Sequence, residues 1–378
     1  MSTLSAWRYT WGLPRPEIPG RTPSVAILVA IKNSSALTRD FLARLRSQAY
    51  PGYRIIAAVE SEADPAFSLL REAAGEPGAD IVAIVAGPVD HGGQKVWNLL
   101  AALTAIKSED EIIVFTDADT LPSPAWLARL VSALTDAGHD AVTGYRWMIP
   151  TDQRLSSAVV AAANASIVTL PRIPEVINLC WGGTTAVRRE TLERIDIAKY
   201  WRGAISDDLQ MTRALNAAGC AIFSPRQSLL LSPIAMDWRE ALAFGQRQYR
   251  LMLTHAPALW FFAAAVTLLP FLAACLAIIL ALQAQVAAIV ALALSIGLGE
   301  LRFLNRRRIV RSLWPETIGA NLALYWRVER FMRPLWWSFH LICIFAALGS
   351  RRIRWAGINY LIRGPQDVEV LGRNSEPS

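Results

Sequence analysis

Two carboxylates stand two residues apart at the end of an uncharged, β-branched run. The run is Ile112 to Thr116, and Asp117 and Asp119 follow it. Such runs are typical of strands covered on both faces, and open α/β sheets bind ligands beyond the carboxyl ends of those strands. Residues two apart on an extended chain project to the same side. Two hard oxygen donors held this way suit Mg²⁺ or Mn²⁺, which could bridge the diphosphate of a nucleotide.

The same carboxylates also admit a structural interpretation. One Asp-x-Asp is expected by chance in roughly every chain of this size, if charged residues are about a quarter of the sequence. Ser123 and Pro124 look like an N-cap and a first helical residue, and Asp119 could cap that turn. The strand that precedes the pair favours the metal interpretation.

A second carboxylate pair, Asp207 and Asp208, begins a predicted amphipathic helix that ends at Gly219. Ser206 or Asp207 is a natural N-cap, which accounts for one carboxylate and leaves the other without a structural reason. Asp208 could face a cleft as a general base and take the proton of an attacking hydroxyl. The residues alone leave these two roles open.

Two arginines three residues apart, Arg247 and Arg250, lie on one face of a helix expected from Asp237 to Thr254. Their guanidiniums could clamp a diphosphate leaving group or bind lipid headgroups. A simple interfacial helix explains them equally well.

The elements that must position these residues alternate between strand and helix. We expect strands at 24–31, 54–59, 112–116 and 140–147, and helices at 35–48, 124–137 and 155–169. This order predicts an α/β fold with a doubly wound, mostly parallel sheet and helices on both faces. Gly182 and Gly183 precede the β-branched run from Thr184 to Val187, as in a loop that needs close backbone approach before a strand.

The chain is too apolar to be wholly soluble, with 53% hydrophobic residues and a mean hydropathy of +0.30. The excess lies between Pro257 and Gly299, which contains no Asp, Glu, Lys or Arg. Two spans are expected near 258–282 and 285–304; the first would be a helix of roughly 37 Å, longer than the roughly 30 Å core of a bilayer. A third segment near 335–349 is shorter and could span or only enter the bilayer.

The net charge of +7 does not indicate nucleic acid binding, because the arginines gather beside the apolar segments. They follow the second span and the third segment, where basic residues mark the cytoplasmic side and contact anionic lipid headgroups. No cleavable signal precedes residue 250, so we expect an integral membrane protein with a cytoplasmic catalytic domain, in a bacterial inner membrane. The four cysteines show no metal spacing and no disulfide framework.

The expected organisation has five parts. They are an irregular arm at 1–22, a catalytic domain at 23–236, an interfacial amphipathic helix at 237–256, a membrane region at 257–349 and a basic cytoplasmic tail at 350–378.

From about Pro23 onward, the residues resemble a known family of enzymes. The blocks are Val29-Ala30-Ile31-Lys32, Ala49-Tyr50-Pro51-Gly52-Tyr53, Asp64-Pro65-Ala66, Gln94-Lys95-Val96-Trp97-Asn98-Leu99, Asp117-Ala118-Asp119, Gly183-Thr184-Thr185, Asp207-Asp208, Arg247-Gln248-Tyr249-Arg250 and the ending Ile353 to Tyr360. In order and spacing they resemble membrane-bound glycosyltransferases of the GT-A fold (family 2 type), most closely the ceramide glucosyltransferases and their bacterial relatives. The resemblance implies a GT-A catalytic domain followed by a C-terminal helical membrane region.

The resemblance also implies roles for individual residues. It makes Asp208 the catalytic base and puts Gly183, Thr184 and Asp207 on the acceptor side. Donor binding falls to Lys32, Glu60, Lys95, Asn98, Asp117, Arg247 and Arg250, and a metal, Mg²⁺ or Mn²⁺, to Asp117 and Asp119. Three features depart from the family: Ser61 stands where aspartate is usual, so that uridine contacts could come from Glu60; Leu251 replaces a usual tryptophan; and the N-terminal anchor is absent.

The expected function is inverting transfer of a hexose from a UDP-sugar donor to the hydroxyl of a membrane lipid acceptor, as in ceramide glucosyltransferase. Other lipids, namely a hopanoid, a diacylglycerol or a polyprenyl phosphate, remain open as acceptors. One rival is a polysaccharide synthase that uses the same chemistry, although two or three spans are few for an export channel. The other rival is a catalytically inactive membrane scaffold.

Overall fold

A computed structural model describes residues 20–76, 78, 80–135, 138–169, 179–225, 228–315 and 322–373. Their contacts divide them into two units. Unit 1 contains the described residues within 147–169 and 233–351, and unit 2 contains those within 20–146, 179–232 and 352–373. Except for residues 20–22, the expected N-terminal arm lies outside the described residues.

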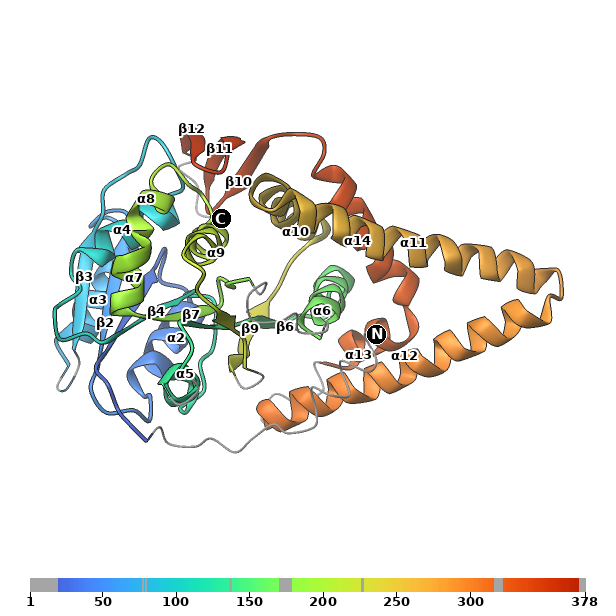
Figure 1. Ribbon diagram of the computed structural model, residues 1–378, viewed down its shortest axis with the longest axis horizontal. Helices are drawn as coiled ribbons and strands as arrows, with labels where there is room; N and C mark the ends of the chain where they lie inside the picture. Colours follow the sequence, from blue (N-terminus) through green and yellow to red (C-terminus); the bar gives the residue numbers. More distant parts are fainter. Residues whose placement is uncertain are drawn as a thin grey trace. The chain divides into compact units, whose positions relative to one another are not determined.

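Unit 2 alternates strands and helices along most of its length (Figure 1). In chain order its elements are β1 (Val25–Ala30), α2 (Ala36–Arg46), β2 (Tyr53–Val59), α3 (Pro65–Ala74), β3 (Ile81–Val85), α4 (Gln94–Leu103), β4 (Ile112–Thr116), α5 (Trp126–Thr135), β5 (Ala141–Gly144), β7 (Thr184–Arg188), α7 (Arg189–Ile195), α8 (Ile197–Trp201), α9 (Asp207–Ala217), β8 (Ile222–Phe223), β10 (Arg352–Trp355), β11 (Ile358–Gly364) and β12 (Asp367–Arg373). The chain passes between the units within β6 (Arg146–Pro150) and β9 (Leu230–Ile234).

The central sheet of unit 2 has the strand order β3-β2-β1-β4-β7-β5-β8. Every neighbouring pair is parallel except the two that involve β7, which runs antiparallel to β4 and to β5. Thr184, the first residue of β7, therefore pairs with Thr116, the last residue of β4. This register brings the Gly182–Gly183 loop to the edge of the sheet where Asp117 begins.

Both faces of this sheet are covered. Alternate residues of β1 point into two separate cores, with Val25 and Ile27 in one and Ala26 and Leu28 in the other. The first core contains side chains of α2, α3 and α5, and the second contains side chains of α4, α7, α8 and α9. The doubly wound, mostly parallel sheet expected from the sequence is therefore confirmed.

A buried ion pair lies within unit 2. Arg54 on β2 donates to both carboxylate oxygens of Asp110, and the two side chains are 6% and 2% exposed. Burial by itself would raise the pKa of Asp110, but the Arg54 guanidinium and the Lys107 amide lower it.

We predict that Asp110→Asn lowers the free energy of unfolding of unit 2 by about 3–5 kcal/mol at pH 7, because it leaves a buried guanidinium without its charge partner. The wild-type pair loses its stabilising effect as the pH falls below the ordinary pKa of aspartate, since the folded-state pKa is depressed. Urea unfolding at pH 7 and at about pH 2, well below the ordinary pKa of aspartate, measures both effects. An equal difference between variant and wild type at the two pH values would contradict the prediction.

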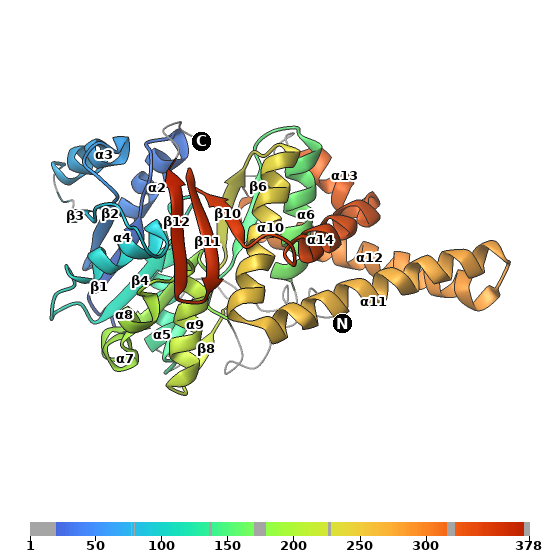
Figure 2. The same cartoon turned by 90° about the horizontal axis from the view of Figure 1, so that it is seen from above.

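Residues 352–373, expected as part of a basic tail, form a three-stranded antiparallel sheet (Figure 2). One side of the sheet carries the buried residues Ile353, Ile358, Tyr360 and Ile362. Alternation of such residues with Arg352, Arg354 and Asn359 is the period-two pattern of a half-buried sheet, and the abundance of arginine obscured it in the sequence.

Unit 1 is mainly helical. Besides parts of β6 and β9, its elements are α6 (Leu155–Val168), α10 (Trp238–His255), α11 (Pro257–Leu282), α12 (Val286–Leu313), α13 (Ala323–Phe331) and α14 (Arg333–Ala346). Asp237 caps α10 in a reciprocal capping box with Glu240, which fixes where the helix begins.

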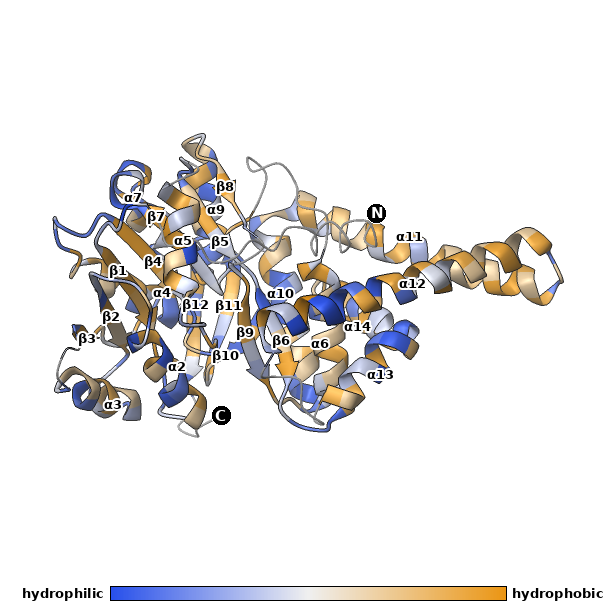
Figure 3. Cartoon of the chain, turned by 90° about the horizontal axis from the view of Figure 1, so that it is seen from below, coloured by the Kyte–Doolittle hydropathy of each residue, from blue (hydrophilic) through white to orange (hydrophobic). Residues whose placement is uncertain are grey.

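Two helices among the described residues, α11 and α12, are long and apolar enough to cross a membrane. They follow one another across residues 283–285, and Figure 3 shows apolar residues along both. Large side chains such as Leu269 and Leu294 are more than half exposed, unlike those of a core helix in a soluble protein. The pair is compatible with the expected membrane region.

The structure differs from the sequence expectation at the end of the second apolar segment. The expected span near 285–304 is part of α12, which continues to Leu313 and carries Arg306 on the helix. The Arg306 guanidinium is buried, bonded to Glu329 at 2.8 Å and to the Thr169 hydroxyl at 3.0 Å. This arginine is therefore held by the protein, whereas we expected the arginines here to face lipid headgroups.

The third apolar segment forms α14, which is not among the candidate spans found in the described chain. Its 14 residues would extend only about 21 Å. His340 is buried within unit 1, where its Nδ1 lies 2.7 Å from the Tyr249 hydroxyl and its Nε2 lies 3.2 Å from the Ala163 carbonyl oxygen. These contacts show α14 packed against α10 and α6.

Candidate active site

The sequence-predicted carboxylates lie at the carboxyl edge of the central sheet in unit 2. Asp117 follows β4, and its backbone N–H lies 3.4 Å from the Gly183 carbonyl oxygen. That carbonyl also accepts a hydrogen bond from the Thr116 hydroxyl at 2.9 Å. The antiparallel strand β7 thus brings a second loop beside the aspartates, as an edge of parallel strands alone would not.

Lys95 joins the two carboxylate motifs. It lies in the first turn of α4, and its Nζ donates to Asp117 at 2.6 Å and to Asp207 at 2.8 Å. The three side chains are 20%, 16% and 10% exposed, in that order. Motifs 90 residues apart in the sequence therefore meet at one ammonium group.

Burial and charge act in opposite directions on the pKa values of this cluster. Burial alone would lower the pKa of Lys95, but Asp117, Asp207 and Asp208 outweigh it and raise the pKa, so the ammonium is charged at pH 7. Burial raises the pKa of Asp117 and of Asp207, with Lys95 opposing it in both cases. One ammonium thus stabilises several desolvated carboxylates.

Asp208 is half-buried at the start of α9, where Ser206 is the N-cap. Its Oδ1 accepts hydrogen bonds from the Ser206 hydroxyl and from the Leu209 N–H. Its Oδ2 accepts from the Gly182 N–H at 3.1 Å. Ser206 caps the helix and Asp207 contacts Lys95, whereas Asp208 directs its Oδ2 toward the Gly182 loop.

Gly182 keeps open a space that two carboxylates share. A Cβ atom at this position would lie 3.1 Å from Asp117 Oδ2 and 3.4 Å from Asp208 Oδ2. Because glycine has no Cβ, the carboxylates of Asp117 and Asp208, which belong to different motifs, can both approach the backbone at Gly182. Gly182 belongs to the loop predicted to need close backbone approach, but the sequence did not single it out as a site residue.

Arg146 is a second site residue that sequence reasoning missed. Its guanidinium lies 3.4 Å from Asp117 Oδ2 and forms a hydrogen-bonded ion pair with Asp119. Gly183 makes room for it, because a Cβ at 183 would lie 2.6 Å from Arg146 Cγ. We expected one strand at 140–147, whereas β5 ends at Gly144 and Arg146 lies at the carboxyl edge beyond it.

Three predicted donor residues lie around the first strands of the same unit. Lys32 donates to the Ala356 carbonyl, and Glu60, which follows β2, pairs with Arg373. Asn98 is buried, and its side-chain amide accepts a hydrogen bond from the Gln94 amide and donates one to the Ala58 carbonyl. Asn98 thus joins α4 to β2 rather than offering an exposed polar group.

The remaining predicted residues occupy two settings. Thr184 is buried within β7, where its backbone pairs with Thr116, the residue before Asp117. Arg247 and Arg250 belong to α10 of unit 1, where Arg247 lies 5.4 Å from the Phe244 ring centroid and Arg250 donates to the Gly349 carbonyl at 3.1 Å. Arg250 therefore joins α10 to the chain that follows α14.

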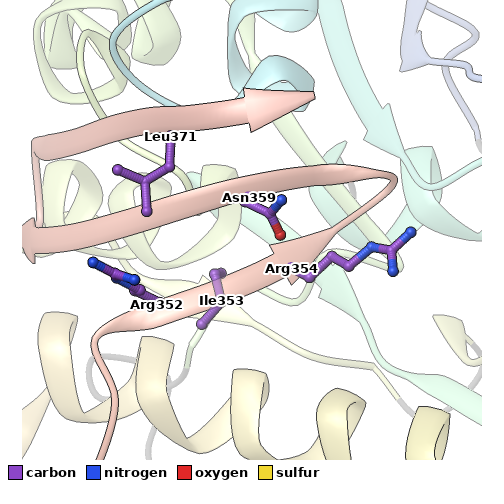
Figure 4. Close-up of a pocket in the computed structure, with 5 residues that line it drawn as sticks. All are labelled: Arg352, Ile353, Arg354, Asn359 and Leu371. Atoms are coloured by element: carbon purple, nitrogen blue, oxygen red, sulfur yellow. The ribbon is translucent and has the colours of Figure 1, made fainter. Parts of the chain in front are cut away.

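The assembled site has an excess of negative charge. Asp117, Asp119, Asp207 and Asp208 face only Lys95 and Arg146 in the contacts described above. Such an arrangement can accept a divalent cation and hold a base beside it. The 420 Å³ hollow over the C-terminal sheet is a separate feature, lined by Arg352, Ile353, Arg354, Asn359 and Leu371 (Figure 4).

Comparison with known proteins identifies relatives of this chain. The family described as Glycosyl transferase family 21 matches residues 1–367. A mannosyltransferase from Pyrobaculum calidifontis, solved in complex with GDP-Man and Mn²⁺, is 21% identical, with a TM-score of 0.50 and coverage of 83% of this chain and 95% of that chain. Glucosyl-3-phosphoglycerate synthase from Mycobacterium tuberculosis is 16% identical, with a TM-score of 0.38 and coverage of 63% and 85%. No curated protein matches the sequence. The predicted GT-A-like fold is confirmed.

Proposed function

The chain belongs to glycosyl transferase family 21, and on that premise we propose that it transfers a hexose from a UDP-sugar to the hydroxyl of a membrane lipid, with inversion at the anomeric carbon. Its membership makes it a nucleotide-sugar glycosyltransferase; the donor, the acceptor and the residue roles are our proposal. The space beside Gly182, which Asp117 and Asp208 both face, carries the proposal. It lets the two carboxylates lie close enough to act on a leaving diphosphate and on an attacking hydroxyl side by side.

On the donor side, the chain supplies some of the ligands that a divalent cation needs, and the donor would supply the others. No group of three or more His, Cys, Asp or Glu side chains suited to a metal occurs among the described residues. Mg²⁺ is commonly held by one or two carboxylates together with substrate phosphates, so Asp117 and Asp119 would suffice once the donor is bound. The cation, Mg²⁺ or Mn²⁺, would neutralise charge that develops on the leaving diphosphate.

On the acceptor side, Asp208 Oδ2 takes the proton of the lipid hydroxyl. The hydroxyl oxygen forms a bond to the anomeric carbon while the bond from that carbon to the diphosphate breaks, which releases UDP. A single displacement of this kind inverts the anomeric centre. The Gly182 N–H holds Oδ2 at 3.1 Å, and Lys95 keeps Asp207 beside it, so the base is oriented before the substrate arrives.

The membrane supplies the acceptor in this proposal. The exposed apolar surface of α11 and α12 supports a lipid environment, and a hairpin of two spans leaves both ends of the pair on the same side. We place the catalytic unit on the cytoplasmic side, where Arg307, Arg308 and Arg311 would meet anionic headgroups. Arg247 and Arg250 would assist at the diphosphate or the headgroup, with Leu251 in place of the usual tryptophan. Ceramide is the favoured acceptor by family likeness.

Two experiments in detergent separate this function from its rivals. Purified protein is incubated with a panel of UDP-sugars and total membrane lipid, and the products are read by mass spectrometry. A single sugar on one lipid class supports the proposal, whereas a polymer would identify a polysaccharide synthase. Absence of both transfer and donor hydrolysis would identify a scaffold.

The metal assignment makes a separate prediction. We expect UDP to bind more tightly with Mn²⁺ than without it. In Asp117→Asn, this increase in UDP affinity should be more than about 10-fold smaller, because even changes to residues that only support metal ligands lower metal affinity by about 10-fold or more. Isothermal titration calorimetry with and without Mn²⁺ measures the effect. Asp140→Asn, at an exposed pair with Arg194, is the control. Equal UDP affinity with and without Mn²⁺ in the wild type would count against the metal site.

A further inference from the structure

The C-terminal strand β12 holds the carboxylate that follows β2. Arg373 forms an ion pair with Glu60, and it donates to the Val89 carbonyl at 2.7 Å and to Gln94 Oε1 at 3.0 Å. The Arg373 and Glu60 side chains are 29% and 20% exposed. A guanidinium with three acceptors is fixed in direction, and it fixes the carboxylate that it contacts.

The C-terminal sheet is bonded to the rest of unit 2 at several other points. The Gly92 N–H donates to the Val368 carbonyl at 2.7 Å, and the Gln94 N–H donates to the Tyr360 hydroxyl at 3.2 Å. The Gln210 amide donates to the Pro365 carbonyl at 2.7 Å. Because both backbone and side-chain groups form these hydrogen bonds, the position of Arg373 does not depend on one side chain.

Glu60 lies where a nucleoside would be expected. It follows β2, which is separated from β4 by β1 alone, and all three strands are parallel. Neighbouring strands lie about 4.8 Å apart, so Glu60 and Asp117 emerge from the same edge at roughly 10 Å from each other. An extended nucleoside diphosphate with its phosphates at Asp117 would place its base and ribose near Glu60.

We propose that Arg373 is a positioning residue for the donor nucleoside, acting through Glu60, and that it contributes to the selection of the nucleobase. This inference rests on the proposed use of a UDP-sugar. Arg373 binds Glu60 Oε1, which leaves Oε2 as an acceptor for a ribose hydroxyl or an imide N–H of the base. A strand that follows the membrane region in sequence thereby becomes part of the nucleotide site.

The test compares Arg373→Ala with Arg373→Lys and with a matched control, Arg363→Ala. Arg363 lies in the same sheet and pairs with Glu369, but both side chains are about half exposed, at 50% and 42%. The full-length protein is titrated by calorimetry with UDP, GDP and inorganic diphosphate, each with Mn²⁺.

We expect Arg373→Ala to weaken UDP binding by about 10-fold or more, as expected for lost hydrogen bonds to a charged group, and to reduce the preference for UDP over GDP. Diphosphate affinity should stay at the wild-type value, Arg373→Lys should recover part of the loss, and Arg363→Ala should bind like the wild type.

Wild-type UDP affinity in Arg373→Ala would overturn the inference, and so would a parallel loss of diphosphate binding, which indicates a structural defect. If the wild type itself binds UDP no better than diphosphate, the proposed donor is wrong, and that outcome is distinct from a failure of Arg373 alone.

Discussion

Asp208→Asn is expected to lower the turnover number by at least about 10²- to 10⁴-fold, the usual contribution of one positioned base. An amide cannot take the proton of the acceptor hydroxyl. Its single amide oxygen can still accept from the Gly182 N–H, which lies 3.1 Å from Oδ2 in the wild type. The amide nitrogen then takes the place of Oδ1, and the Leu209 N–H keeps the Ser206 hydroxyl as its acceptor at 3.3 Å, so the loop and the helix start should keep their places. UDP affinity should therefore remain near the wild-type value. Steady-state transfer assays and UDP calorimetry on the same preparation measure the two effects.

A control for the loss of a carboxylate at a helix start is available in unit 2. Asp64 caps α3, accepting from the Ala66 N–H at 2.9 Å, and asparagine is an equally good cap. Asp64→Asn should therefore turn over at the wild-type rate. Near-normal turnover of Asp208→Asn would remove Asp208 from the role of base, and loss of UDP binding in that variant would mean that it has a structural role instead.

Lys95→Met is expected to damage both stability and donor binding. It removes the ammonium that lies between Asp117 and Asp207 and leaves carboxylates with little exposure facing each other. Breaking a buried ion pair costs about 3–5 kcal/mol, and we expect a loss near 3 kcal/mol because these groups keep some solvent contact. UDP affinity should fall as well, since unopposed negative charge repels a diphosphate.

The effect of Lys95→Met should depend on pH in a definite direction. Burial already raises the pKa of Asp117 and Asp207 in the wild type, and loss of Lys95 raises both further. A carboxyl whose folded pKa is raised destabilises the fold when ionised, and protonation relieves this as the pH falls. The difference in unfolding free energy between variant and wild type should therefore shrink from pH 8 to pH 5.

Lys107→Met is the control for the Lys95 variant. Lys107 lies 3.9 Å from Glu109 with both side chains more than half exposed, and such pairs contribute about 0–1 kcal/mol. Equal losses of stability in the two variants would show that the burial of Lys95 has no energetic consequence. A pH-independent difference for Lys95→Met would contradict the electrostatic origin.

Much of the fold was predictable because local patterns encode it. Short apolar, β-branched runs marked β1, β2 and β4, and the alternation with helices implied a doubly wound sheet, as observed. The uninterrupted apolar segments marked α11 and α12 for the same reason. The pattern failed at 352–373, where arginines on one face concealed a strand period of two, and at 140–147, where a break between β5 and β6 left no sign in the side-chain types.

The candidate site was predictable only in its parts. Asp117, Asp119, Asp207 and Asp208 could be found from their position after a strand or before a helix. The resemblance placed Lys95 at the donor site, but its contacts with the aspartates could not be predicted. Lys95 is 22 residues from Asp117 and 112 from Asp207, and only the folding of α4 against the sheet brings them together. Arg373 is 313 residues from Glu60.

Residue type and short-range spacing thus specified a family of glycosyltransferases, a carboxylate edge and two apolar helices. The tertiary structure added what depends on register and on free space: the antiparallel strand β7, the gap that Gly182 leaves between Asp117 and Asp208, and the guanidiniums of Arg146 and Arg373. The physical reason is that residue types and short spacings are read directly from the sequence, whereas the distance between two charges depends on how strands pair and loops pack.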